Sequence, residues 1–297
     1  MPRLRSLLIQ WRGETVAEHY FHGATAGRRV NIKSASKSIL SALVGIAIAE
    51  GHIPGVHSTL GELLPAETQG LEPEKRDITV GDLLSMRAGL RSTSFDNYGE
   101  WVTSSNWVRS ALAQPIVAPR GDRGPMIYST GSTHLLSAVV ARRTGMSTHR
   151  FAQRHLARPL GIDLRPWQTD PQGIHFGGND MYLTPRELLR FGALYLGRGS
   201  WNGTQVLPAA WVDSSFVQRT SSPWNGNGYG YGWWTRTARG VRVHYAWGYG
   251  GQFVFLAPSL ELVIAMTSDA ETPREGGHNS ALHRLVDDDI VPAVSIP

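Results

Sequence analysis

The sequence predicts an α+β fold in which one antiparallel sheet is formed from both ends of the chain and is flanked by helices. Strand-like segments open the chain and return near its end, whereas helix-like segments occupy the middle. We therefore expect residues 1–55 and 178–297 to form a discontinuous sheet lobe, and residues 56–177 to form a mostly helical inserted lobe. A crevice between two such lobes is a usual place for a small-molecule site.

The N-terminal segment SLLIQWRGETVAEHYF reads as two strands joined at Arg12-Gly13, which is a hairpin signal. Residues 34–50 follow as a predicted helix that ends at Gly51. Because this segment is apolar on most sides, we expect the helix to be buried.

Capping residues predict two helices in the inserted lobe. The segment ITVGDLLSMRAGL, residues 78–90, is expected to form a short helix that opens after Thr79 and closes at Gly89. Residues 132–145 are expected to form another helix, with Gly145 as its C-terminal cap.

The C-terminal third returns to the sheet. Residues 183–199 predict a helix with Thr184 as its N-cap and Pro185 at the first helical position. A last helix is expected over residues 277–290. Between these helices four segments read as strands: YGYGWWTR, RVHYAWG, GQFVFLAP and ELVIAMTS.

The composition is that of a globular protein with a sizeable core, since 41% of the 297 residues are hydrophobic and 18% are charged. The net charge of +5 comes from arginines that are spread along the chain, so we expect no nucleic-acid partner. The chain has no cysteine, which excludes a disulfide, a thiolate nucleophile and a cysteine-based zinc site.

Membrane and export signals are weak. The first apolar stretch is too short for the core of a signal peptide, and the longest apolar segment, residues 39–49, is about half a membrane span. We therefore expect no membrane span and, for the sequence as given, a cytoplasmic protein. A true start further upstream would make it periplasmic or secreted. No feature of the sequence predicts an oligomeric state.

The stretch NIKSASKSIL, residues 31–40, holds two of the three lysines in the chain. Ser34 and Lys37 are three residues apart and therefore share one face at the start of the predicted helix. A serine hydroxyl needs a base to become a nucleophile, and lysine can serve only when it is neutral. Burial and free N–H groups at the helix start favour this chemistry, because they lower the lysine pKa and stabilise an oxyanion.

Two further motifs carry compatible chemistry. Tyr128 lies just before the predicted helix of residues 132–145, and a tyrosine hydroxyl near a lysine can shuttle a proton between nucleophile and leaving group. Near the C-terminus, glycines open a strand in AWGYGGQFVFLAP, residues 246–258. Glycine lets a substrate approach the backbone closely, and an edge N–H there can be a second oxyanion donor.

In this order, the three motifs resemble the penicillin-recognising serine hydrolases. The sequence is most similar to the class C β-lactamase-related branch, which includes esterases, DD-peptidases and 6-aminohexanoate-oligomer hydrolases. ITVGDLLSMRAGL is similar to the family's usual ITVRHLLTHTSGL, and DMYLTPRELLRFGALYLGRGSWNGTQVLP and YGYGWW are also similar to stretches of the branch. The resemblance covers roughly residues 5–290 and implies a β-lactamase/transpeptidase-like fold.

The resemblance implies a role for each matched position. Ser34 is the expected acylated nucleophile, Lys37 the base that activates it, and Tyr128 the proton relay. The backbone N–H groups of Ser34 and Tyr249 are the expected oxyanion hole. The expected substrate-binding residues are Gly248, Gly250, Thr130 and Trp247.

Two departures from the family pattern bear on the substrate. The third motif usually opens with Lys or His, but Trp247 and Gly248 stand there and residues 245–254 contain no cation. Thr130 replaces an Asn and lacks the paired donor and acceptor of the amide. We therefore expect hydrolysis of a small ester or amide. The alternatives are a β-lactamase or DD-peptidase activity, or a penicillin-binding or sensor module with little turnover.

Further residues are candidates for roles in or near the site. Asp180, which follows Asn179, is expected either to support the site indirectly or to open the following helix. Five tryptophans are candidates for an apolar acyl pocket: Trp101, Trp107, Trp233, Trp234 and Trp247.

No cofactor or metal is expected. The pairs His19 with His22 and His52 with His57 lack an H-E-x-x-H pattern, so we interpret them as structural. The sequence contains no G-x-S-x-G elbow, no G-x-G-x-x-G and no P-loop, so nothing implies an α/β-hydrolase or a nucleotide.

Overall fold

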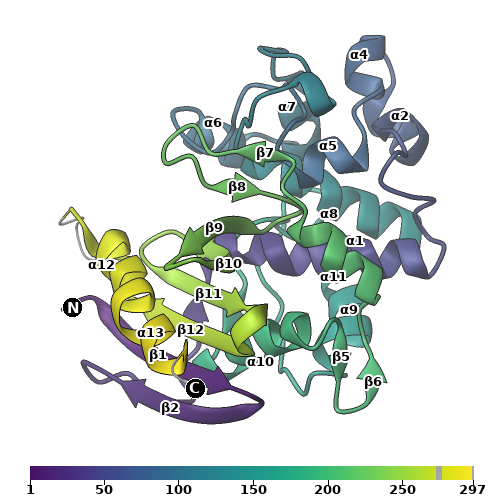
Figure 1. Cartoon of the computed structure of the whole chain (residues 1–297). Helices are drawn as coiled ribbons and strands as arrows, with labels where there is room; N and C mark the ends of the chain where they lie inside the picture. The colour runs from purple at the N-terminus through teal and green to yellow at the C-terminus, as the bar shows by residue number, and fades with distance from the viewer. Residues whose placement is uncertain (272–275, 296–297) are drawn as a thin grey trace.

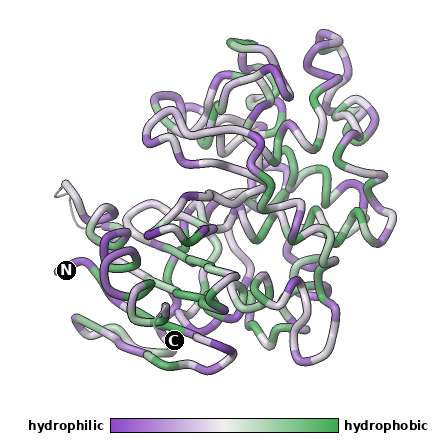
Figure 2. Tube along the Cα trace, viewed as in Figure 1, coloured by the Kyte–Doolittle hydropathy of each residue, from purple (hydrophilic) through white to green (hydrophobic). Residues whose placement is uncertain are grey.

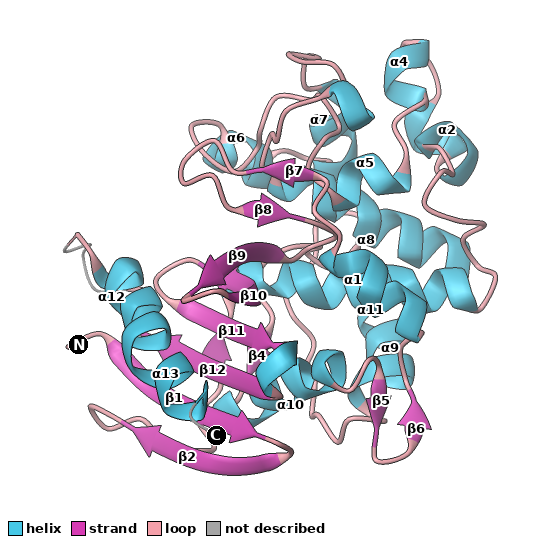
Figure 3. Cartoon of the chain, viewed as in Figure 1, coloured by secondary structure: helices cyan, strands magenta, loops and turns pink. Residues whose placement is uncertain are grey.

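The computed structural model describes residues 1–271 and 276–295 and places a large antiparallel sheet beside a group of helices (Figure 1). Figure 3 shows that the strands gather in one part of the molecule, and that most of the short helices gather in the other. The predicted α+β class, with a sheet flanked by helices, is confirmed. The lobe boundaries at residues 55/56 and 177/178 stay a prediction.

The main sheet has eight strands in the order β2-β1-β12-β11-β10-β9-β8-β7, and every neighbouring pair is antiparallel. The predicted origin of the sheet in both chain ends is confirmed, because β1 pairs with β12 and Leu8 lies opposite Ala265. The strands are β1 (Leu4–Trp11), β2 (Glu14–Tyr20), β7 (Thr220–Ser221), β8 (Gly228–Tyr229), β9 (Trp234–Ala238), β10 (Val241–Gly248), β11 (Gln252–Ala257) and β12 (Leu262–Ser268). Two small pairs join β3 (Val30–Asn31) to β4 (Tyr182–Leu183) and β5 (Ser200–Trp201) to β6 (Thr204–Gln205).

The central strands are buried on both faces. Along β11, Val254 and Leu256 belong to the core that contains the long helices, whereas Phe253 and Phe255 belong to the core under the C-terminal helices. This alternation follows from the two-residue period of a strand. It explains why β11 is apolar from Phe253 to Ala257, and Figure 2 shows hydrophobic segments along the central strands.

Two long helices pack beside the sheet. The helix predicted at residues 34–50 is α1 (Ser36–Ala49), which is buried along most of its length as expected, although its first turn is the 3₁₀ turn η1 (Lys33–Ala35). The helix predicted at residues 183–199 is α10 (Pro185–Leu196), and its N-cap Thr184 forms a capping box with Glu187. Gly192 lets α10 approach the sheet, because a Cβ there would lie 2.6 Å from Val263.

Between β3 and β4, where every residue is described, the named elements are helical. The longest is α8 (Thr130–Thr144), which ends at Gly145 in the left-handed conformation as predicted. The others are α2 (Leu60–Leu63), α3 (Pro65–Thr68), α4 (Pro73–Arg76), α5 (Val80–Leu84), α6 (Tyr98–Thr103), α7 (Trp107–Ala113), η2 (Gly121–Arg123), α9 (Thr148–Ala152) and the π-helical turn η3 (Gln153–Ala157).

The prediction that the helix after Thr79 runs to Gly89 is wrong at the C-terminal end. The helix begins after Thr79 as expected, but α5 ends at Leu84. Met86 then adopts a left-handed φ of 59°, and its carbonyl accepts a hydrogen bond from the N–H of Ile127. The chain after α5 therefore contacts the segment that carries Tyr128 instead of continuing the helix.

Two C-terminal predictions also need correction. YGYGWWTR is not one strand, because Gly230 to Trp233 form a turn between β8 and β9, closed by a hydrogen bond from the Gly230 N–H to the Trp233 carbonyl. The helix predicted at residues 277–290 continues to residue 295 as three consecutive helical segments, α12 (His278–Arg284), η5 (Leu285–Ile290) and α13 (Val291–Ser295). The remaining helical elements are α11 (Ala209–Phe216) and η4 (Pro258–Leu260). No helix of the described residues is long and apolar enough to span a membrane.

Candidate active site

Ser34 lies on the tight 3₁₀ turn that leads into α1. Lys33, directly before it, has a left-handed φ of 51°, and the Lys33 N–H donates to Asn31 Oδ1 at 2.9 Å. The Ser36 hydroxyl donates to the Lys33 carbonyl at 2.7 Å. These side-chain bonds satisfy backbone groups of the turn and hold it rigid, so the position of Ser34 is fixed by its neighbours in sequence.

The amine of Lys37 contacts three polar groups. Lys37 Nζ lies 3.0 Å from Ser34 Oγ, 2.8 Å from the Gly178 carbonyl oxygen and 3.3 Å from Thr130 Oγ1. The predicted juxtaposition of Ser34 and Lys37 is therefore present, and the Gly178 carbonyl and Thr130 Oγ1 also hold the amine. Gly178 was missed in the sequence because it acts through a backbone carbonyl, which has no residue signature.

Burial controls the protonation of this amine. Lys37 is 3% exposed, and desolvation lowers its pKa to about 7. A substantial share of the side chain is therefore neutral near pH 7. A neutral amine has the lone pair that a general base needs to take the proton of Ser34.

Tyr128 reaches Ser34 from the segment that precedes α8. Burial raises the pKa of Tyr128, and a hydrogen bond with Ser34 offsets part of the rise. The phenol therefore keeps its proton at neutral pH. The ring stacks on Trp234 with centroids 5.9 Å apart, and Lys37 Nζ lies 5.0 Å from the centroid of the Tyr128 ring.

The loop before α6 caps the start of α8 and thereby holds the segment of Tyr128. The hydroxyl of Ser92 donates to the Tyr128 carbonyl at 2.6 Å. The Thr130 N–H donates to Ser94 Oγ at 2.7 Å, and the two hydroxyls of Thr130 and Ser94 are also 2.7 Å apart. Ser94 was missed in the sequence, although the run Ser92-Thr93-Ser94 is typical of residues that cap helices.

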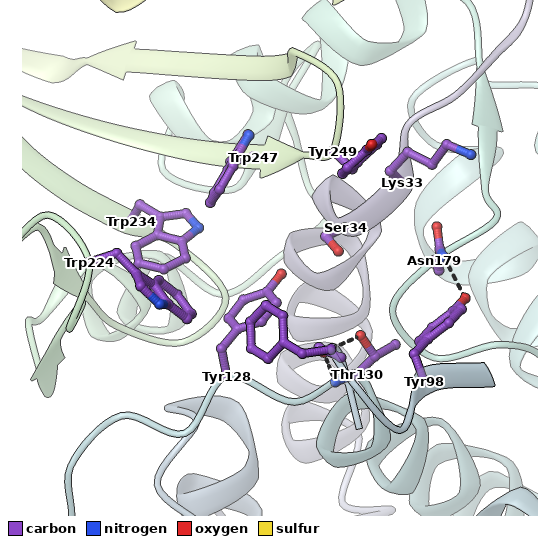
Figure 4. A pocket seen from close by; sticks show the side chains of 12 residues that line it. Lys33, Ser34, Tyr98, Tyr128, Thr130, Asn179, Trp224, Trp234, Trp247 and Tyr249 are labelled. Carbon is purple, nitrogen blue, oxygen red and sulfur yellow. Dashed lines mark hydrogen bonds between the residues drawn. The ribbon is translucent and has the colours of Figure 1, made fainter. Parts of the chain in front are cut away.

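A cavity of about 580 Å³ opens in front of Ser34. Figure 4 shows that its lining side chains come from the turn before α1, the start of α6, the segment before α8, the loop before β4, and the strands β9 and β10 with neighbouring loops. The lining residues are Lys33, Ser34, Ser94, Phe95, Tyr98, Tyr128, Thr130, Asn179, Trp224, Trp234, Trp247 and Tyr249.

The prediction that five tryptophans are candidates for the acyl pocket is correct for two of them and wrong for three. Trp234 and Trp247 line the cavity, as does Trp224, which was not predicted. Trp101 and Trp107 instead pack against one another in the core beside α8, with ring centroids 5.4 Å apart. Trp233 is fully buried next to Tyr195. Hydrophobicity alone did not separate these groups, because an indole fills a core and lines a pocket equally well.

The glycine-rich end of β10 lies against the turn of Ser34. A Cβ on Gly248 would be 2.1 Å from the Ile32 carbonyl oxygen, so only glycine allows this approach. Tyr249 follows and lines the cavity. Gly250, with φ of 82°, lines a second cavity of about 280 Å³ that shares Trp247 and Tyr249 with the first.

Asn179 and Asp180 lie on the loop that delivers the Gly178 carbonyl. Asn179 lines the cavity, and its amide donates to the Tyr98 hydroxyl at 3.2 Å. The Asp180 carboxylate accepts from Asn31 Nδ2 at 2.9 Å, which ties this loop to the turn of Ser34. The described residues contain no cluster of His, Asp and Glu that could hold a metal.

Comparison with known proteins agrees with this geometry. The family model described as Beta-lactamase matches residues 6–288. The chain belongs to the β-lactamase family. A curated relative, 6-aminohexanoate-dimer hydrolase of Paenarthrobacter ureafaciens, is 24% identical over 294 residues, which cover 90% of this chain and 73% of the relative.

Solved structures show the same β-lactamase family fold. An octameric penicillin-binding protein homologue from Pyrococcus abyssi superposes with a TM-score of 0.76 at 17% identity, covering 96% of this chain and 73% of that one. A β-lactamase from Mycobacterium bovis superposes with a TM-score of 0.73 at 18% identity, covering 99% and 96%. The resemblance that the motifs predicted is therefore confirmed at the level of family and fold.

Proposed function

We propose that this chain is a serine hydrolase that cleaves a small ester or amide through an acyl-enzyme on Ser34. The proposal is supported above all by the contact of Lys37 Nζ with Ser34 Oγ at 3.0 Å beside a cavity of about 580 Å³. Membership of a hydrolase family agrees with it.

The reaction follows from the groups around Ser34. The neutral amine of Lys37 takes the hydroxyl proton while Oγ attacks the carbonyl carbon of the substrate. The N–H groups of Ser34 and Tyr249 stabilise the oxyanion of the tetrahedral intermediate. Tyr128 relays the proton from Lys37 to the leaving alkoxide or amine, which departs and leaves the acyl group on Oγ. Water then attacks the carbonyl carbon of the acyl-enzyme while the same relay takes its proton. The bond between that carbon and Oγ breaks, the relay returns the proton to Oγ, and the carboxylic acid leaves.

The walls of the cavity favour simple esters and amides with an apolar part. Trp224, Trp234 and Trp247 offer aromatic surface, whereas Thr130 stands where penicillin-binding relatives have an amide. The name of the Paenarthrobacter relative supports an amide substrate with a free amino end. The described lining residues include no carboxylate that could pair with such an ammonium, which counts against that substrate for this chain.

The test is covalent labelling and turnover with the intact protein. We expect the wild type to gain the mass of one fluorophosphonate and to hydrolyse 4-nitrophenyl butyrate, and Ser34→Ala to lose both. A wild-type rate in Ser34→Ala would contradict the proposal. Stable labelling by penicillin without turnover of any ester or amide would instead support a penicillin-binding module, which is the second candidate because penicillin-binding homologues share the fold.

A further inference from the structure

The cavity in front of Ser34 has an uneven distribution of charge. Among the described residues that line it, Lys33 has the one charged side chain, and the rest are aromatic or neutral polar. The Lys33 side chain is 24% exposed, so most of it is withdrawn from water. A partly desolvated ammonium that faces no carboxylate inside the cavity attracts an anion.

Lys33 is placed by a strained backbone. Its φ of 51° is unusual for a residue with a Cβ, and the Asn31 side chain holds its N–H in this conformation. Such conformations persist where the surrounding structure over-determines them, and they cluster at functional sites. The turn that presents Ser34 therefore also fixes the point from which the Lys33 side chain leaves the backbone.

The aromatic and the charged side chains lie on different sides of Ser34. Figure 4 shows Trp224, Trp234 and Trp247 on one side, and Lys33, Asn179 and Tyr98 on the other. Tyr98 and Asn179 are already hydrogen-bonded to each other. A ligand that spans Ser34 consequently meets an apolar wall at one end and an ammonium with neutral polar neighbours at the other.

We propose that Lys33 forms an anion subsite, so that the substrate carries a carboxylate on one side of the scissile bond and an apolar group on the other. This inference rests on the proposed function for its reaction. The subsite itself is a statement about binding, and binding can be measured without any turnover.

Glu271 is the ion-pair partner of Lys33 in the structure, and it competes only weakly with a ligand carboxylate for the Lys33 ammonium. The two side chains are 3.7 Å apart, and the Glu271 side chain is 88% exposed. An ion pair with so exposed a member contributes little, because water and salt screen it. A ligand carboxylate that is held in place by the aromatic wall can therefore displace it.

The experiment compares two unreactive ligands of the same shape, 4-phenylbutanoate and 4-phenylbutanamide. Their binding is followed by the fluorescence of the cavity tryptophans in the intact wild type. We expect the carboxylate to bind about tenfold more tightly than the amide, as for one charge-assisted contact, and added salt to reduce only the affinity for the carboxylate. Equal affinities, or no binding of either ligand, would overturn the proposal.

Variants then test whether the preference for the carboxylate ligand depends on Lys33. Lys33→Gln should reduce the ratio of the two affinities to about one, and Lys33→Arg should retain it, since a guanidinium also pairs with a carboxylate. Glu271→Gln should strengthen binding of the carboxylate. Arg28→Gln removes one exposed positive charge outside the cavity lining and should keep the wild-type ratio. A ratio that survives in Lys33→Gln but falls in Arg28→Gln would show a general charge effect and sink the subsite.

The same titration is repeated in Ser34→Ala, which separates this proposal from the proposed function. A carboxylate preference in both proteins, with no hydrolysis of any ester or amide by the wild type, would support the subsite and count against the serine hydrolase. Hydrolysis by the wild type without a carboxylate preference would support the serine hydrolase and overturn the subsite.

Discussion

The three polar neighbours of Lys37 Nζ suit both of its protonation states. A neutral amine donates two hydrogen bonds, here to the Gly178 carbonyl and Thr130 Oγ1, and its lone pair accepts the Ser34 hydroxyl. After it takes the proton, the ammonium donates to all three. No side chain has to move during the transfer, which is the condition for a preorganised base.

The pH dependence of acylation should report this base. Because burial lowers the pKa of Lys37 to about 7 and raises that of Tyr128, the active form has a neutral amine and a neutral phenol. We expect kcat/KM for 4-nitrophenyl butyrate to rise with pH through an apparent pKa of about 7 and then to stay level up to pH 9. Lys37→Arg, which keeps its charge, should lose activity by roughly 10²–10⁴-fold. A profile that falls above pH 7 would contradict a lysine base.

At the scale of elements, the capping residues located helix starts well. Thr79, Thr184 and Gly145 stand where they were predicted because capping depends on local backbone geometry. The end of α5 was misplaced because the contact of Met86 with Ile127 is tertiary and has no local signal. For the same reason, the sequence indicated Ser34, Lys37 and Tyr128 through their motifs but did not indicate the Gly178 carbonyl.

The Gly178 loop offers a test at this scale. A Cβ on Gly178 would lie 2.2 Å from Thr133 Oγ1 and 3.1 Å from Lys37 Nζ, so the loop must move away from α8 in Gly178→Ala. The carbonyl then no longer holds the amine, and we expect kcat/KM to fall by at least about tenfold, as for loss of one aligning contact. Gly55→Ala, whose new Cβ meets no atom within 4 Å, is the matched control. Equal activities of the two variants would show that the contact is dispensable.

For the whole molecule, the buried amine imposes a cost on folding that depends on pH. Below pH 7 Lys37 is charged in both folded and unfolded chains, and the folded chain bears the full desolvation penalty. Between its folded pKa of about 7 and the ordinary lysine pKa of 10.5, the unfolded chain binds more protons, so stability rises with pH.

We therefore expect Lys37→Met to be more stable than the wild type at pH 6, with a difference that shrinks as pH rises. The slope of that difference approaches about 1.4 kcal/mol per pH unit where the unfolded amine is charged and the folded amine is neutral. Urea unfolding at pH 6, 8 and 9.5 measures it, provided that the m-values agree. A difference that does not change with pH would show that the folded amine titrates as it does in the unfolded chain.

The pairing of β1 with β12 has a consequence during protein synthesis. Leu8 of β1 lies opposite Ala265 of β12, so the hairpin of β1 and β2 leaves the ribosome long before the partner strand β12 is synthesised. Contacts so distant along the chain form late and slowly. The edge of β1 that pairs with β12 is therefore unpaired through nearly all of translation, and the helices that follow must assemble around a sheet that the last part of the chain completes.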